Sequence, residues 1–261
     1  MRRKRQDFTD SSFFTHPDRH LPSPAEVRTL SGDVGEIPTS KLVTFEHFDL
    51  ILKFGLHVTL LEAVNLWMVH RVSKDRVPVP EVFGWRVDDE GCVFIYMELV
   101  KRPTLRKHWK TLDNAGKKVI CNQLSKTVQS LRRLEQDPSD QFIGSINKEN
   151  LHDYVFTVQP KMGPFPTVKD FNDQFALLHQ LRFPTRYEDP NRCHMPDNVD
   201  IKFTHADLHR SNIIYWEYCK ALYTAPYKDE WRRDGFIDGV IQPWDVVFLV
   251  WSEYCMAMGA V

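Results

Sequence analysis

Short alternating runs of apolar and polar residues mark the first hundred positions of the chain. The runs KLVTF (41–45) and DLILKFG (49–55) are separated by a polar turn, and this pattern predicts a β-hairpin. Two further apolar runs, within residues 78–99, flank the acidic turn Asp88-Asp89-Glu90-Gly91 and predict a second hairpin.

A helical pattern lies between the two hairpins. Thr59 can cap a helix that runs through LLEAVNLWMVHRV, with Leu60, Leu61, Val64 and Met68 on the face expected to cover the sheet. Residues 40–100 therefore read as a small mixed sheet with one helix.

The polar, proline-containing segment 1–39 is predicted to be an N-terminal extension. Its only regular element is a short helix, which Ser23 caps, Pro24 opens and Gly32 ends.

After Val100 the pattern becomes helical. An apolar stripe with a 3.6-residue period runs from Val119 to Leu134, and a weaker stripe covers 168–183. IKFTH (201–205) is typical of a short strand, and the chain returns to helix after Pro243. The predicted fold is α+β and two-lobed, with a sheet-rich lobe at 40–100 and a larger helical lobe at 101–261.

Composition and charge exclude several classes of protein. The 261 residues are 42% hydrophobic, and 34 basic residues nearly balance 35 acidic ones, so no net field favours nucleic acid or anionic lipid. The five cysteines contain no Cys-x-x-Cys pair, and no secretory signal is recognised, which predicts reduced thiols in a cytoplasmic protein. The most apolar run, Val246–Trp251, is far too short to span a membrane.

The stretch HADLHRSN (205–212) carries the strongest chemical signal. His205, Asp207 and Asn212 have the spacing H-x-D-x-x-x-x-N of a kinase catalytic loop, in which the Asp orients the attacking hydroxyl and the Asn binds a metal. Two other interpretations remain open. His205, Asp207 and His209 alternate as metal ligands on a strand would, and Asp207 also suits a structural polar turn.

Two upstream residues strengthen the kinase interpretation. Phosphoryl transfer from ATP needs a strand lysine that holds phosphates and a helix glutamate that positions it. Lys53 lies in the strand-like run LILKFG, and Glu62 lies in the helix that follows.

With these residues in place, the chain resembles the aminoglycoside phosphotransferase family, fungal type, within the protein-kinase-like fold. The resemblance rests on LILKFG, LLEAVNL, PVPEVFGW, YMEL, FIGS, GPFPTVKDFND, FTHADLHRSNI and YWEYCKAL, and covers most of residues 40–225. It implies use of ATP and Mg²⁺ to phosphorylate a small-molecule hydroxyl.

The resemblance also implies a role for each site residue. Lys53 would contact nucleotide phosphates and Glu62 would pair with it, while Met97, Glu98 and Leu99 would form the hinge beside adenine. In the catalytic loop, 203–213, Asp207 would be the catalytic base and Asn212 a magnesium ligand, with His205 supporting the loop.

The chain departs from the family at the second metal-binding aspartate. In the family this residue follows a second strand after the loop, but here Ile213-Ile214 runs directly into YWEYCKAL, as if that strand and the Asp had been deleted. Asp238 and Glu217 are the candidate substitutes. An impaired phosphotransferase and a catalytically inactive nucleotide-binding or interaction protein are therefore both expected possibilities. The expected partners are a nucleotide and an unidentified small-molecule acceptor bound near residues 145–195, with no nucleic acid and no membrane.

Overall fold

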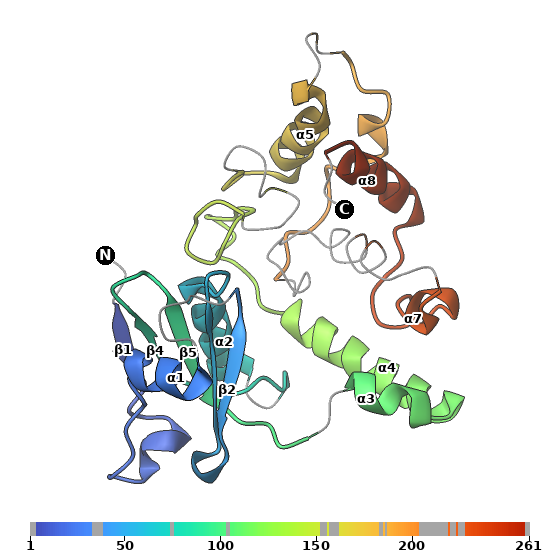
Figure 1. Cartoon of the computed structure of the whole chain (residues 1–261). Coiled ribbons are helices and arrows are strands. Elements are labelled where there is room, and N and C mark those ends of the chain that lie inside the picture. The colour runs from blue at the N-terminus through green and yellow to red at the C-terminus, as the bar shows by residue number, and fades with distance from the viewer. Residues whose placement is uncertain are drawn as a thin grey trace. The chain divides into compact units, whose positions relative to one another are not determined.

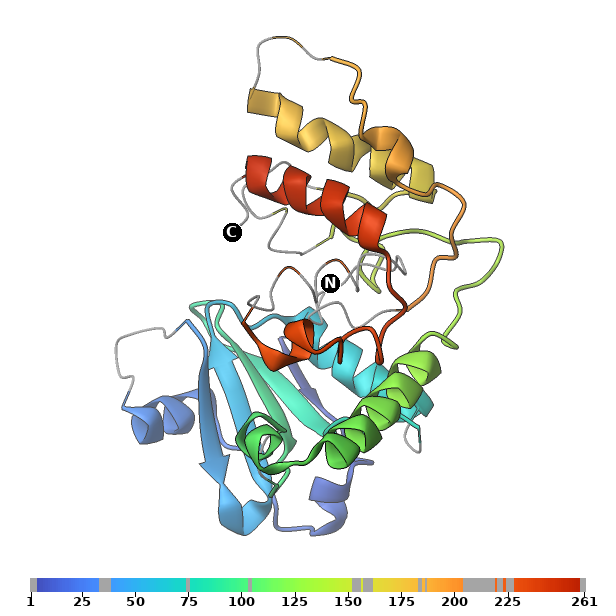
Figure 2. The same ribbon diagram turned by 90° about the vertical axis from the view of Figure 1, so that its right-hand side faces the viewer.

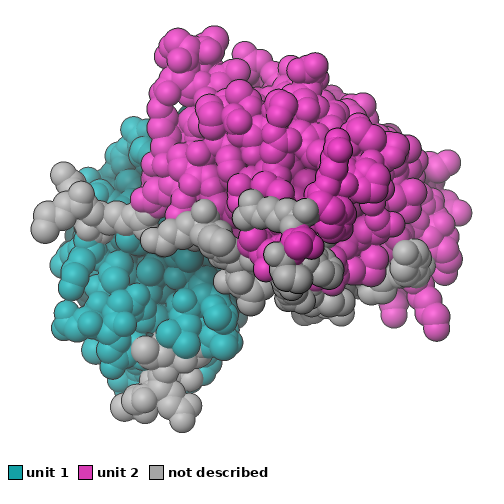
Figure 3. Space-filling view, turned by 90° about the horizontal axis from the view of Figure 1, so that it is seen from above, with its two compact units in different colours: residues 1–108 teal, residues 109–261 magenta. Residues whose placement is uncertain are grey.

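The computed structural model describes residues 4–32, 39–73, 76–102, 105–151, 156, 162–182, 185, 187–203, 219, 223 and 228–258. The chain divides into two compact units, residues 1–108 and 109–261 (Figure 3). The first unit thus extends beyond the expected boundary at residue 100 and includes the short helix α3 (Leu105–His108).

Unit 1 is built on a five-stranded sheet with the order β1-β4-β5-β3-β2 (Figure 1). Its strands are β1 (Arg5–Asp7), β2 (Lys41–Phe45), β3 (Leu50–Gly55), β4 (Val82–Val87) and β5 (Val93–Glu98). Both predicted hairpins are confirmed. The expectation of a mixed sheet is wrong, because every pairing among these strands is antiparallel.

The two faces of the sheet carry different cores because side chains alternate along each strand. On β3, Leu50, Leu52 and Phe54 are fully buried and join one cluster, whereas Ile51 belongs to the cluster on the other face. Lys53 shares the Ile51 face.

Helix α2 (Leu60–Ser73) confirms the predicted helix and covers the Ile51 face. Its packing differs from the predicted stripe. Leu60, Ala63, Leu66 and Trp67 contact the sheet cluster, while Val64 and Met68 remain half-buried outside it. The face of α2 that packs on the sheet is therefore rotated about the helix axis by about one residue from the predicted face.

The N-terminal residues belong to this unit and are not a separate extension. β1 pairs with β4, and the 3-10 helix η1 (Ser12–Thr15) and helix α1 (Pro24–Ser31) bring Phe13 and Val27 into the cluster on the second face. The predicted ends of α1 are confirmed: Ser23 and Glu26 form a reciprocal capping box, and Gly32 ends the helix at φ 76°. The sequence did not predict this packing, because the segment is polar overall and only a few of its residues are buried.

Unit 2 is helical in its described part. Its longer helices are α4 (Asn114–Leu131), α5 (Val168–Leu178) and α8 (Asp245–Met258), joined by the short helix α7 (Glu230–Arg233) and the 3-10 helices η3 (Trp109–Thr111), η5 (His179–Arg182) and η6 (Arg192–His194). Figure 2 shows α5 and α8 side by side, and Phe175 contacts both Trp251 and Tyr254 in the core between them.

The predicted helices of unit 2 are confirmed in position but not in every buried residue. Asp113 caps α4 by accepting a hydrogen bond from the Gly116 amide at 2.8 Å. Val119, assigned to the apolar stripe, is 55% exposed, whereas Lys117, Cys121 and Leu131 are buried. Across the described residues of both units, no helix has the length and apolarity that a bilayer crossing requires.

Candidate functional site

Lys53 lies on β3, an inner strand of the unit 1 sheet. Its backbone is paired with Ile95 of β5 on one side and with Leu42 of β2 on the other. The alternation of β3 places its side chain on the face that α2 covers, away from the Leu52 and Phe54 core. A strand paired on both sides fixes the backbone from which this lysine projects.

Glu62 lies in the first turn of α2 and points to Lys53. The helix begins where the Thr59 hydroxyl accepts a hydrogen bond from the Glu62 amide at 3.3 Å. The Nζ of Lys53 then donates to Oε1 of Glu62 at 2.5 Å. The predicted approach of these two side chains is confirmed.

The side chains of Lys53 and Glu62 are both partly exposed to solvent. The Lys53 and Glu62 side chains retain 32% and 29% of their accessible surface. An ammonium group has three hydrogens to donate and Glu62 takes one, so the others can reach an anion arriving from solvent. This arrangement suits a lysine that holds a phosphate and is oriented by a carboxylate.

The expected hinge residues lie at the end of β5. Met97 is buried between β3 and β4, where it pairs with Ile51 and Val82, and Glu98 is exposed. The Glu98 amide donates to the Glu81 carbonyl at 2.9 Å, and the Leu99 amide donates to the Asp49 carbonyl at 2.8 Å. Both amides are thus engaged within the sheet. An adenine bound here would have to use carbonyl groups of these residues or the backbone beyond Leu99.

The catalytic-loop residues Asp207 and Asn212 lie outside the described residues, as do His205, His209 and Glu217. Asp238, the other candidate metal ligand, is described. It is exposed in a turned segment after α7, next to buried Ile237, whose amide donates to the Trp231 carbonyl at 3.2 Å. In the part of the chain that is described, no three His, Cys, Asp or Glu side chains come together to hold a metal ion. Asp238 thus belongs to no group of three such side chains among the described residues.

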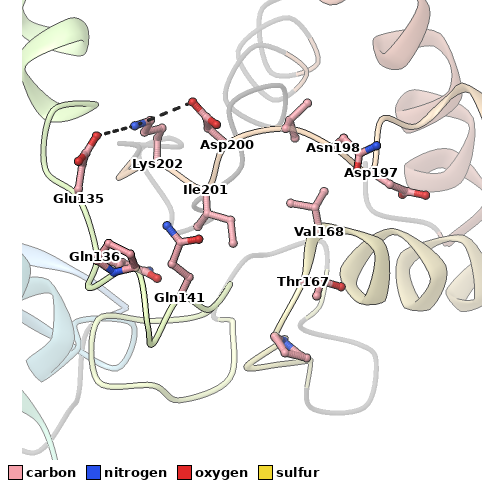
Figure 4. Close-up of a pocket in the computed structure, with 13 residues that line it drawn as sticks. Glu135, Gln136, Gln141, Thr167, Val168, Asp197, Asn198, Asp200, Ile201 and Lys202 are labelled. Carbon is pink, nitrogen blue, oxygen red and sulfur yellow. Dashed lines mark hydrogen bonds and ion pairs between the residues drawn. The ribbon is translucent and has the colours of Figure 1, made fainter.

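Unit 2 contains a polar pocket of about 400 Å³ that the sequence did not predict (Figure 4). It is lined by segments 135–141, 166–168 and 197–202, so only one short segment falls within the expected acceptor region. Its charged lining side chains are Glu135, Asp197, Asp200 and Lys202.

Lys202 ties two of the pocket's carboxylates together. Its Nζ donates to Glu135 at 2.8 Å and lies 3.9 Å from Asp200 (Figure 4). The hydrogen bond from Lys202 lowers the pKa of Glu135 and raises the pKa of Lys202 in return. Both groups are therefore charged near neutral pH.

Asp197 is held in the pocket wall by a network on the side of α5. It accepts hydrogen bonds from Arg192 at 2.5 Å and from fully buried Asn172 at 2.9 Å, and Arg192 also pairs with Asp173 of α5. The network fixes the segment leading from η6 to Lys202. The run PDNVDIK in the sequence was the available signal, but its pairing with distant helix residues could not be read from spacing.

The chain is similar in structure to solved proteins with which it shares little sequence identity. No protein-family model matches the chain, and no curated protein does. Among solved structures it is similar to a thermostable mutant of aminoglycoside phosphotransferase APH(4)-Ia in the apo form, with 11% identity and a TM-score of 0.42 over 89% of this chain and 97% of that one. It is also similar to APH(2")-IIa in a ternary complex with streptomycin and ATP, with 11% identity and a TM-score of 0.31 over 67% of this chain and 56% of that one. These neighbours are aminoglycoside phosphotransferases, and likeness at this level assigns no function to the chain.

Proposed function

We propose that the chain is a phosphotransferase of the protein-kinase-like type, which transfers the γ-phosphoryl group of ATP to a hydroxyl of a small molecule. The observation that carries the proposal is the 2.5 Å contact between Lys53 on a central strand and Glu62 on the helix that covers it. Phosphoryl transfer depends on positioning and on charge stabilisation, and this pair positions one positive charge.

Each residue has a definite part in the proposed reaction. Lys53 donates to nucleotide phosphate oxygens, and Glu62 orients the ammonium group. Asp207 accepts or orients the proton of the acceptor hydroxyl, and Asn212 contributes a metal ligand. Magnesium, when bound with ATP, neutralises charge on the β- and γ-phosphates.

The resemblance to the phosphotransferases implies a second metal-binding aspartate at the end of a strand after Ile214, where this sequence continues with Tyr215 and Trp216. We infer that turnover is low, because Asn212 is neutral and Asp207 is then the only carboxylate of the loop available near the metal. An inactive nucleotide-binding protein is the second candidate function, and the same gap in the sequence favours it.

For the acceptor we propose the pocket of unit 2. Ile201 and Lys202 line it and run directly into the loop that carries Asp207. Glu135 and Asp200 lie within 4 Å of Lys202, Asp197 lines another part of the wall, and the amides of Gln136, Gln141 and Asn198 add hydrogen-bonding groups. A polar acceptor with a positive charge and hydroxyl groups suits this lining.

Calorimetric titration of ATP, with and without magnesium, tests the proposal together with an assay for phosphorylated product. We expect weak binding with little magnesium dependence, and turnover orders of magnitude below that of an enzyme with both metal ligands. Strong tightening by magnesium together with accumulation of product would show that a second metal carboxylate exists. Absence of any ATP binding would contradict both candidate functions.

A further inference from the structure

The N-terminal segment contacts α2 at a point remote from Glu62. Phe8, directly after β1, stacks on Trp67 of α2 with ring centroids 5.2 Å apart and planes 12° apart. The same ring meets the edge of Trp85 on β4 at 5.4 Å. Phe8 therefore lies between the helix and the sheet, where it touches an aromatic residue of each.

A second contact holds the last turn of α2 to the same segment. Arg71 donates to Asp10 at 2.7 Å, and its guanidinium also lies 5.6 Å from the centre of the Trp67 ring. Both side chains of the ion pair are about 60% exposed, since 61% of Asp10 and 58% of Arg71 is accessible. The ring stack therefore contributes more to the attachment than the exposed ion pair does, and the ion pair restricts the orientation of the last turn of α2.

These contacts and the Lys53–Glu62 pair hold α2 across the width of the sheet. Glu62 in the first turn reaches β3, whereas Trp67 and Arg71, further along the helix, reach the segment next to β4 and β1. Those strands lie on opposite sides of β5. At 100° per residue, Arg71 also lies about 180° around the helix from Glu62, so the two contacts are made from opposite sides of α2.

Other side chains of α2 are buried as well. Ala63 belongs to the cluster on the sheet side, with Leu60 and Leu66 partly buried against it, whereas Leu61 and Val69 are buried outside that cluster. Val72 is 52% exposed. On the side that faces the sheet, the Phe8 ring therefore adds a large aromatic contact beside one small buried residue and two partly buried ones.

We propose that Phe8 and Asp10 form an N-terminal clamp that positions α2 and thereby sets the distance between Glu62 and Lys53. The clamp residues are positioning residues: they touch neither Lys53 nor the expected nucleotide, and they act through the helix. Their effect on phosphoryl transfer rests on the proposed function, whereas their effect on the Lys53–Glu62 pair does not.

Competitive chemical labelling of lysines in the full-length chain, read by mass spectrometry, tests the clamp. Phe8→Ala is expected to raise the labelling rate of Lys53 about threefold, because a partly exposed ion pair protects its ammonium group by a factor of that order. Lys101, which pairs with Asp49 in the same unit, is the internal reference and should keep its rate. Phe14→Ala is the matched control, since Phe14 lies in the same segment but packs on the other face of the sheet.

Charge reversal at Asp10 and Arg71 gives a second test, in which both substitutions are at exposed positions. Asp10→Arg should raise Lys53 labelling, and combining it with Arg71→Asp should restore the wild-type rate in part. The clamp is refuted if Lys53 labelling is unchanged in Phe8→Ala, if Lys101 accelerates equally, or if the double variant labels no more slowly than Asp10→Arg. Failure of the wild-type chain to bind ATP would contradict the proposed function and would leave this labelling comparison intact.

Discussion

At the scale of single residues, the Lys53–Glu62 pair shows what spacing can predict. A lysine on an apolar strand and a glutamate in the first turn of the next helix can meet when the helix covers the lysine's face, and here Nζ of Lys53 lies 2.5 Å from Oε1 of Glu62. The state of the hinge could not be predicted, because the partners of the Glu98 and Leu99 amides, Glu81 and Asp49, come from other parts of the chain.

The catalytic role of Asp207 gives a prediction at this scale. Asp207→Asn should abolish any phosphotransfer while it leaves ATP affinity nearly unchanged, since the amide keeps the shape but cannot accept the hydroxyl proton. Product formation and calorimetric affinity should be measured on the same preparation. Activity equal to that of the wild type would favour the interpretation of the loop as a structural turn.

A buried cation in unit 2 leads to a prediction on pH. Lys117, which is buried, donates to Glu230 at 2.6 Å and is the main cause of the lowered pKa of that carboxyl, with Trp109 donating a further bond at 2.7 Å. A carboxyl with a lowered folded-state pKa stabilises the fold above its ordinary value near 4.5, and this stabilisation is lost as pH falls through the folded-state pKa.

Glu230→Gln should therefore lower the free energy of unfolding at pH 7 and reduce its loss on acidification. Denaturant titrations at pH 7 and near pH 3 measure both effects. Glu188→Gln, at an exposed position, is the control and should leave the pH dependence as it is. An acid transition in Glu230→Gln identical to that of the wild type would contradict this account.

At the scale of elements, predictions succeeded where apolar runs are bounded by polar turns. β3 largely alternates between buried and partly buried positions, whereas β5 is buried on both faces of the sheet and is marked by its apolar run after the acidic turn. β1 follows no such pattern: Arg5, Gln6 and Asp7 are polar, and this edge strand is defined by its partner β4. The buried face of α2 was misjudged because nine of its 14 residues are apolar and they surround most of the helix, so spacing alone did not select one side.

The docking of β1 on β4 depends on a glycine. A Cβ at Gly84 would lie 2.4 Å from the Gln6 carbonyl oxygen and 2.9 Å from Leu21. Gly84→Ala should force the strands apart and lower the free energy of unfolding by about 1–3 kcal/mol, as overpacking does. Denaturant unfolding measures the loss, and Gly239→Ala, whose added carbon would meet its nearest atom at 3.4 Å, should cost much less. Equal stability of the two variants would contradict the close approach.

At the scale of the whole molecule, the chain consists of two units with the proposed chemistry divided between them. Unit 1 carries Lys53 and Glu62, and unit 2 carries the loop with Asp207 and Asn212 and the polar pocket before it. The sequence predicted a change from strands to helices after residue 100, and the division between the units falls after His108. The pocket was beyond prediction, since three segments separated by up to about sixty residues form it.

In the proposed function, Lys53 holds the phosphates of a nucleotide. Calorimetric titration of the Lys53→Met variant with ATP tests this role, with Lys101→Met as the matched control at an exposed lysine of the same unit that also pairs with a carboxylate. Loss of a charge-assisted phosphate contact should weaken ATP binding at least about tenfold in Lys53→Met, and Lys101→Met should bind as the wild type does. Equal ATP affinity in Lys53→Met and the wild type would contradict the claim.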